Sequence, residues 1–90
     1  MIKLFDIQWK LSAKKELRKI DKIEIPKILK EIETLSKNPY PTNCKKILGT
    51  EHIFRIKIGK YRVIYSIENQ KLIIEIIRVR HRKEVYKKFP

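Results

Sequence analysis

The chain has 90 residues and carries 23 Lys and Arg against 10 Asp and Glu, a formal charge of +13 at neutral pH. This length predicts a single domain over residues 1–90 and excludes a two-domain enzyme. With 42% hydrophobic residues, 2 Gly and 4 Pro, the composition is that of a folding domain and not of a disordered basic tail. A surface with this charge is expected to meet a polyanionic partner.

The few cysteine and histidine residues exclude several kinds of site. Cys44 is the one cysteine, so no intramolecular disulfide can form, and with His52 and His81 it makes too small a set for a zinc site. We therefore expect no metal, no cofactor and a reducing cytoplasmic location. The N-terminal residues contain no apolar stretch of signal-peptide length, and no apolar run is long enough to span a membrane.

The first part of the chain predicts a strand followed by two helices. Apolar side chains alternate with polar ones from Phe5 to Trp9, which is typical of a short strand. Ser12 is the expected N-cap of a helix that ends at Lys19 or Ile20. A second helix is expected from about Ile23 to Ser36, with Pro26 in its first turn and apolar residues at helical spacing.

The second part predicts antiparallel strands. A loop is expected from Pro39 to about Lys46 and contains Cys44. Alternation from Phe54 to Ile58, the turn at Gly59-Lys60 and a second run from Tyr61 to Ile67 predict a hairpin.

A third long strand is expected after a polar turn. The run from Leu72 to Val79 is almost continuously apolar, which indicates a central strand or one covered on both faces. The basic residues from Arg80 to Pro90 are expected to form a short C-terminal helix. The sequence thus predicts an α/β (α+β) domain: N-terminal strand, helical hairpin, three or four mainly antiparallel strands forming a twisted sheet, then that helix.

The positive charge is concentrated in the C-terminal part. Residues 55–90 hold 11 Lys and Arg against 3 Glu, a net charge of +8. Arginine is suited to bidentate phosphate contacts and to base stacking. All but one of the arginines lie in this segment: Arg55, Arg62, Arg78, Arg80 and Arg82.

Strand alternation predicts which of these cations share a face. If Ile56 and Ile58 face the helices, Arg55 and Lys57 face away from them, where like charges repel one another. A surface that tolerates such repulsion is often built for a polyanion, although exposed cations also serve solubility. The expected phosphate-binding residues are Arg55, Lys57, Arg78, Arg82 and Lys83.

Two residues near the C-terminus are candidates for proton transfer. On the third strand, Arg78 and Arg80 continue the alternation of Ile74, and His81 falls on the opposite parity. His81 has an ordinary pKa near neutrality and is a candidate acid or base, although a surface histidine at a strand end is the commoner case. Tyr86 is the other candidate, because neighbouring guanidinium groups would stabilise its phenolate.

Other chemistries lack their residues. The sequence shows no pair of carboxylates on one face for two-metal cleavage, no glycine-rich phosphate loop and no Ser/His/Asp set. RNA cleavage needs none of these, because the 2′-OH of RNA can attack the adjacent phosphate. The enzyme then supplies positioning, charge stabilisation and proton transfer.

Two motifs carry a resemblance to a known family. The stretch Gly59-Lys60-Tyr61-Arg62-Val63-Ile64-Tyr65 and the ending Arg80-His81-Arg82-Lys83-Glu84-Val85-Tyr86, together with the order of elements, resemble the RelE/ParE superfamily of type II toxin–antitoxin systems, and the RelE branch in particular. This resemblance implies a fold similar to microbial ribonucleases. It also implies cleavage of mRNA in the ribosomal A site, which inhibits translation.

The resemblance also implies roles for individual residues. The basic pair on the strand before the Gly-Tyr-Arg turn falls on Arg55 and Lys57, with Arg55 where Lys is familiar. In this assignment Arg62 and Arg80 hold the scissile phosphate, and Tyr86 activates the 2′-OH. Protonation of the 5′-leaving oxygen is left open between Arg80 and His81, because arginine gives up its proton reluctantly.

Two alternative functions remain open from the sequence. A ParE-like toxin would share the fold and poison DNA gyrase, and a non-catalytic module would hold nucleic acid with the same arginines. The resemblance implies as partners the ribosome with its mRNA and an acidic RelB-like antitoxin. We expect a monomeric toxin that forms a hetero-oligomer with this antitoxin, and no membrane association.

Overall fold

The computed structural model describes residues 4–83 and shows a five-stranded mixed sheet with two helices. Its elements are β1 (Asp6–Trp9), α1 (Leu11–Arg18), α2 (Ile25–Thr34), β2 (Cys44–Lys46), β3 (Ile53–Ile58), β4 (Tyr61–Glu68) and β5 (Ile73–His81). The strand order is β1-β5-β4-β3-β2, with β1 parallel to β5 and the other neighbours antiparallel. The expected α+β architecture is confirmed for these residues. The predicted C-terminal helix over residues 80–90 is wrong at its start, because Arg80 and His81 belong to β5, and its part from residue 84 on, with Tyr86, lies outside the described residues.

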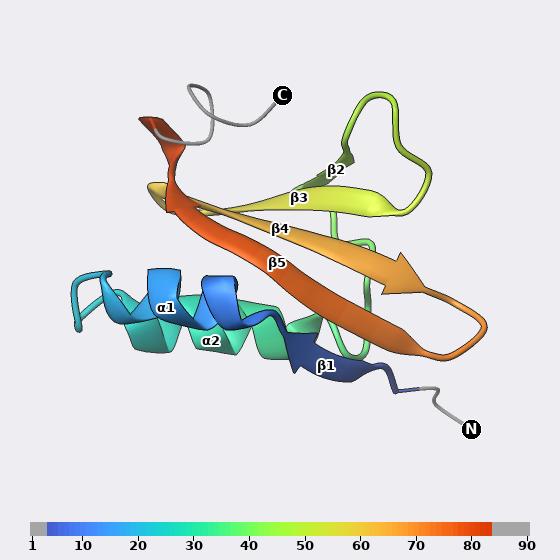
Figure 1. The fold of residues 1–90 in the computed structure, drawn as a ribbon, viewed down its shortest axis with the longest axis horizontal. Coiled ribbons are helices and arrows are strands. Elements are labelled where there is room, and N and C mark those ends of the chain that lie inside the picture. The colour runs from blue at the N-terminus through green and yellow to red at the C-terminus, as the bar shows by residue number, and fades with distance from the viewer. Residues whose placement is uncertain (1–3, 84–90) are drawn as a thin grey trace.

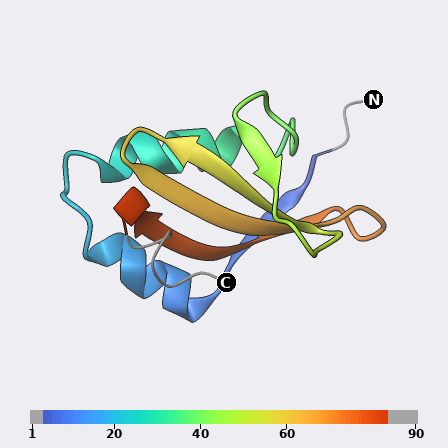
Figure 2. The same cartoon turned by 90° about the horizontal axis from the view of Figure 1, so that it is seen from above.

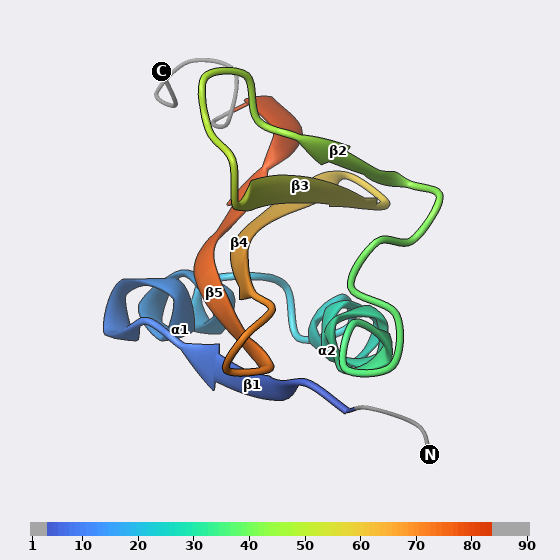
Figure 3. The same cartoon turned by 90° about the vertical axis from the view of Figure 1, so that its right-hand side faces the viewer.

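The sheet is strongly curved, and the two helices occupy different places against it. Helix α2 lies in the concave side of the sheet, whereas α1 follows β1 and lies along β5 (Figures 1 and 3). Seen from above, β4 and β5 run between the two helices (Figure 2). The β3–β4 turn and the end of β5 therefore meet at one end of the sheet, beside the end of α1.

The hydrophobic core lies between α2 and the concave face of the sheet. Ile28 and Ile32 of α2 are at most 2% exposed, and they pack with inward-facing side chains of β3, β4 and β5. Burial of one such side chain stabilises the fold by roughly 1.5–3 kcal/mol. The inward-facing residues of the sheet include Ile56, Val63, Tyr65, Ile67, Ile74, Ile76 and Val79.

The bounds of both helices differ from those that the sequence pattern predicts. Helix α1 begins at Leu11 and not after Ser12, because the Lys10 N–H pairs with the Ile76 carbonyl and the Lys10 carbonyl then accepts from Lys14 N. The strand therefore leads directly into the helix, and no side chain caps it. Helix α2 begins two residues later than expected and ends at Thr34.

The predicted loop around Cys44 is wrong in one respect, because residues 44–46 form strand β2. Cys44 lies opposite Ile56 of β3, so this short strand extends the sheet at its edge. Behind it, Tyr65 is completely buried and its hydroxyl donates to the Pro39 carbonyl at 2.8 Å. Burial raises the pKa of Tyr65, and the nearby Cys44 adds to this shift.

The C-terminal strand differs from its prediction in length and in alternation. Strand β5 extends to His81 instead of ending at Val79. Opposite β4, Ile76 pairs with Tyr65 and Arg78 with Ile64, so Ile77 is an extra residue that forms a β-bulge. The bulge reverses the alternation, and Val79 enters the core in place of Arg78 and Arg80. The unbroken alternation predicted that these two arginines share the face of Ile74, and this prediction is wrong.

Candidate functional site

A row of three cations crosses the sheet on the face opposite the core. Lys57 of β3 lies opposite Arg62 of β4, and Arg62 lies opposite Arg80 of β5. Side chains at directly opposed positions share a face of the sheet, with Cβ atoms about 4.5–5.5 Å apart. Ile56 and Val63, next to these residues in the strands, point into the core. We call Lys57, Arg62 and Arg80 the cationic row.

Arg62, in the middle of the row, is buried although it is charged. Its residue is only 7% exposed, and it is the buried charged residue among those that the structure describes. Nη1 donates to the carbonyls of Gly59 at 3.1 Å and Tyr61 at 2.9 Å, while Nε has no partner among residues 4–83. A buried, incompletely paired cation between two others is costly, and an anion placed here would relieve the cost.

A second row lies beside the first on the same face. Arg55 of β3 lies opposite Ile64 of β4, and Ile64 lies opposite Arg78 of β5. Ile64 is completely buried yet does not belong to the hydrophobic core cluster. The structure therefore brings together five cations that the sequence singled out, across three adjacent strands: Arg55, Lys57, Arg62, Arg78 and Arg80.

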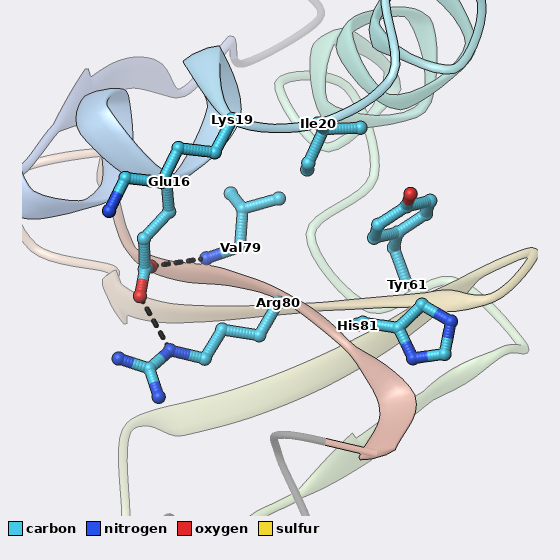
Figure 4. A pocket seen from close by; sticks show the side chains of 7 residues that line it. All are labelled: Glu16, Lys19, Ile20, Tyr61, Val79, Arg80 and His81. Carbon is cyan, nitrogen blue, oxygen red and sulfur yellow. Dashed lines mark hydrogen bonds and ion pairs between the residues drawn. The ribbon is translucent and has the colours of Figure 1, made fainter.

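Glu16 of α1 reaches this group from the edge of the sheet. Its Oε2 accepts from Arg80 Nε at 2.5 Å and lies 3.7 Å from Arg78 Nη1, while its Oε1 accepts from the Val79 N–H at 3.0 Å (Figure 4). The Glu16 side chain is 18% exposed. The sequence analysis did not select Glu16, although it is the one acid in an otherwise basic helix.

His81 lies on the other face of the sheet. It is opposite Tyr61, whose ring it contacts edge-on at 5.6 Å between centroids, and Tyr61 in turn is opposite Ile58 of the core. Figure 4 shows both rings on the far side of β5 from the Arg80 guanidinium. They line a pocket of about 390 Å³, whose other lining residues are Glu16, Lys19, Ile20, Val79 and Arg80. The structure does not bring His81 together with Arg62.

The remaining candidates lie beyond the end of β5. Arg82 and Lys83 are exposed, and the Arg82 N–H donates to the Lys60 carbonyl at 2.8 Å, which joins this segment to the β3–β4 turn. Tyr86 lies outside the described residues. No cluster of three His, Cys, Asp or Glu suited to a metal occurs within residues 4–83. No helix in the same part of the chain is long and apolar enough to cross a membrane.

Comparison with known proteins identifies the family. The family model described as the ParE toxin of the type II toxin-antitoxin system parDE matches residues 7–86. The putative toxin RelE1 of Methanocaldococcus jannaschii is 30% identical over 86 residues, which cover 92% of this chain and 96% of that protein. Toxin RelE3 of the same organism is 36% identical over 55 residues, or 61% of this chain and 60% of the other.

Solved structures have the same fold. RelE in the archaeal RelE–RelB complex from Pyrococcus horikoshii superposes with a TM-score of 0.79 at 25% identity, covering 88% of this chain and 96% of that one. The RelB–RelE complex from Methanococcus jannaschii gives 0.76 at 28% identity, with 92% and 99% covered. The chain therefore belongs to the RelE/ParE family of type II toxin–antitoxin toxins.

Proposed function

We propose that this toxin is a metal-independent endoribonuclease that cleaves mRNA in the ribosomal A site. The observation that supports this most directly is Arg62, a buried cation with an unpartnered Nε between Lys57 and Arg80. A surface that served only solubility would leave its cations in water. A phosphate oxygen at Arg62 would accept a hydrogen bond for which the described residues provide no acceptor.

The proposed reaction needs only groups that this face and the RNA provide. The 2′-oxygen attacks the adjacent phosphorus and the bond to the 5′-oxygen breaks, which leaves a 2′,3′-cyclic phosphate and a 5′-hydroxyl end. Arg62 and Arg80 stabilise the charge that develops on the phosphoryl oxygens, and Lys57 and Arg55 bind neighbouring phosphates. We assign removal of the 2′ proton to Tyr86, on the resemblance to the family.

Protonation of the leaving 5′-oxygen is assigned to the cationic face. An imidazole gives up a proton more readily than a guanidinium, but His81 lies across the sheet from Arg62 and packs against Tyr61. A general acid must come within hydrogen-bonding distance of the oxygen that it protonates. Arg80 lies on the correct face, where its terminal N–H groups can donate hydrogen bonds to the leaving alkoxide, and a proton from water then completes the 5′-hydroxyl.

Cleavage on ribosomes programmed with mRNA tests this proposal. The wild-type toxin is expected to cut within the A-site codon, and Arg62→Ala to cut about 100-fold more slowly or worse. Tyr86→Phe is expected to lose activity as well. Lys27→Ala is the matched control, because Lys27 is exposed on α2, away from the cationic row. Cutting that survives both Arg62→Ala and Tyr86→Phe would contradict the site assignment.

The same material distinguishes the alternative functions. The family model that matches the chain carries the ParE name, which keeps gyrase inhibition as the second candidate. Inhibition of DNA supercoiling without mRNA cleavage would support a ParE-like toxin. A salt-dependent shift of RNA with neither activity would indicate a binding module.

We further propose an acidic antitoxin as the partner. Similar solved structures are RelE–RelB complexes, and a chain of charge +13 attracts an acidic, partly disordered segment that folds on binding. The toxin alone is expected to be a monomer. Co-expression with an acidic RelB-like antitoxin, followed by size-exclusion chromatography, should give a hetero-oligomer that no longer cleaves mRNA. Two separate peaks and full activity would contradict this partner.

A further inference from the structure

The Glu16 carboxylate makes two contacts with β5, at the point where β1 no longer pairs with this strand. Strand β1 pairs with β5 only as far as Trp9 opposite Ile76, and the chain then turns into α1. Beyond Ile76 this edge of β5 has no strand partner within residues 4–83, and the Val79 N–H points away from β4 toward Glu16. Glu16, in the second turn of α1, accepts that N–H with Oε1 at 3.0 Å. The backbone of β5 therefore fixes one oxygen of the carboxylate.

The other oxygen holds Arg80 from the side. Glu16 Oε2 accepts from Arg80 Nε at 2.5 Å, which leaves the terminal nitrogens Nη1 and Nη2 without a partner within residues 4–83. A guanidinium held through Nε presents its two terminal N–H groups together, in the fork that matches two phosphate oxygens. Figure 4 shows this arrangement at the edge of the sheet.

We propose that Glu16 is a positioning residue that orients Arg80 for the scissile phosphate. Its carboxylate fixes the rotamer of a long side chain before RNA binds, so less conformational freedom is lost on binding. It also offsets the repulsion between Arg80 and the neighbouring Arg62 without occupying the nitrogens that face the ligand. This inference rests on the proposed function for its reaction, and not for the contact itself.

A double-mutant cycle between Glu16 and Arg80 tests the proposal. Glu16→Gln keeps the length of the side chain and an oxygen for the Val79 N–H, but it removes the charge that holds Arg80. In single-turnover cleavage we expect about a 10- to 100-fold lower maximal rate and a smaller change in KM. In an Arg80→Ala background the same substitution is expected to change the rate less than twofold, because Glu16 acts through Arg80.

Three outcomes would overturn the proposal. An equal loss in both backgrounds would mean that Glu16 acts through the Val79 N–H or Arg78 and not through Arg80. Faster cleavage by Glu16→Gln would mean that the carboxylate competes with phosphate for Arg80. No change of the rate in either background would mean that Arg80 is oriented without Glu16. Glu31→Gln, an equal change of charge at an exposed site on α2, is the matched control and should leave the rate within about twofold.

A readout without cleavage separates this proposal from the proposed function. The same cycle is measured on the affinity for a single-stranded DNA oligonucleotide, which lacks the 2′-OH and cannot be cut. In NMR spectra, the Nε–H resonance of Arg80 in the wild type should lie away from the position of a solvent-exposed arginine, and in Glu16→Gln it should return toward that position. If Glu16→Gln does not fold, Glu16→Asp is the second variant. A toxin that never cuts mRNA but shows this coupling would refute the nuclease and retain the positioning role. Additive effects on affinity with an unchanged Nε–H resonance would refute the positioning role alone.

Discussion

Replacing Arg62 with methionine should stabilise the fold while it abolishes RNA cleavage. Arg62 is 7% exposed, and its Nε has no acceptor among the described residues. An unsatisfied buried donor costs roughly 1–3 kcal/mol, and more when it is charged. Repulsion from Lys57 and Arg80, at the adjacent positions of the row, adds about 1 kcal/mol after solvent screening. Methionine keeps an unbranched, apolar stem of similar length and removes both costs.

The stabilising hydrogen bonds that Arg62→Met removes contribute less than these costs. Arg62 Nη1 donates to the carbonyls of Gly59 and Tyr61, and each of these hydrogen bonds contributes about 0.5–1.5 kcal/mol. The balance favours Arg62→Met by about 1–2 kcal/mol. For a chain of this size that corresponds to a rise in melting temperature of roughly 5–10 °C.

Thermal and urea unfolding measure this difference directly. Lys57→Met is the matched control, since Lys57 is exposed in the same row, and its unfolding free energy should change by no more than about 0.5 kcal/mol. Added inorganic phosphate should raise the melting temperature of the wild type and raise that of Arg62→Met less. If Arg62→Met is destabilised by more than about 1 kcal/mol, the reasoning is refuted, because Arg62 would then stabilise the hairpin even without a bound anion.

Three further predictions concern charge, ionisation and the hairpin turn. Binding of single-stranded RNA should weaken with salt with a log–log slope of about −0.7 per phosphate contacted, and Lys57→Ala should reduce this slope by about 0.7 in fluorescence anisotropy. The raised pKa of Tyr65 means that the folded state keeps its proton when the unfolded chain loses it, so stability should fall above about pH 10 and fall less in Tyr65→Phe; equal pH profiles by urea unfolding would contradict this. Gly59 has φ +58°, so Gly59→Ala should lower the unfolding free energy by about 1 kcal/mol and Gly59→Asn by less, and equal stability of all three proteins by calorimetry would exclude strain at this turn.

The sequence predicts those parts of the fold whose pattern is local. Alternation on either side of Gly59-Lys60 placed the β3–β4 hairpin correctly, and it also predicted that Lys57 points away from the core beside Ile56. The helical spacing of apolar residues predicted helix α2, and Ile28 and Ile32 of this helix lie in the core. Each of these patterns depends on neighbours within a few residues, so the chain itself carries the information.

Other features depend on pairing with distant segments, and no local sequence pattern predicts them. Strand β2 has three residues and exists because Cys44 and its neighbours meet β3. The bulge at Ile77 adds one residue against β4 and thereby exchanges the faces of Val79 and Arg80. A count of alternating residues continues through such a position unchanged, so it assigns every later side chain to the wrong face.

The candidate site was predicted by residue type but not by arrangement. The resemblance to the family named Arg62 and Arg80, yet burial of Arg62 and its unpaired Nε appear only in the structure. Glu16 lies 64 positions from Arg80 in the chain, and its one sequence signal is that it is an acid in a basic helix. The contact arises because β1 ends early and α1 takes its place beside β5.

The core and the proposed phosphate-binding residues use opposite faces of the same strands. Ile56, Val63 and Val79 face inward and carry the core, while Arg62 and Arg80 face outward from neighbouring positions. Outward side chains can therefore change without disturbing the core, so the fold by itself does not specify a chemistry. A toxin that acted through its shape alone would gain nothing from a buried cation with an unsatisfied donor. The predicted cost of Arg62 to the stability of the fold has a physical reason if this cation binds a phosphate.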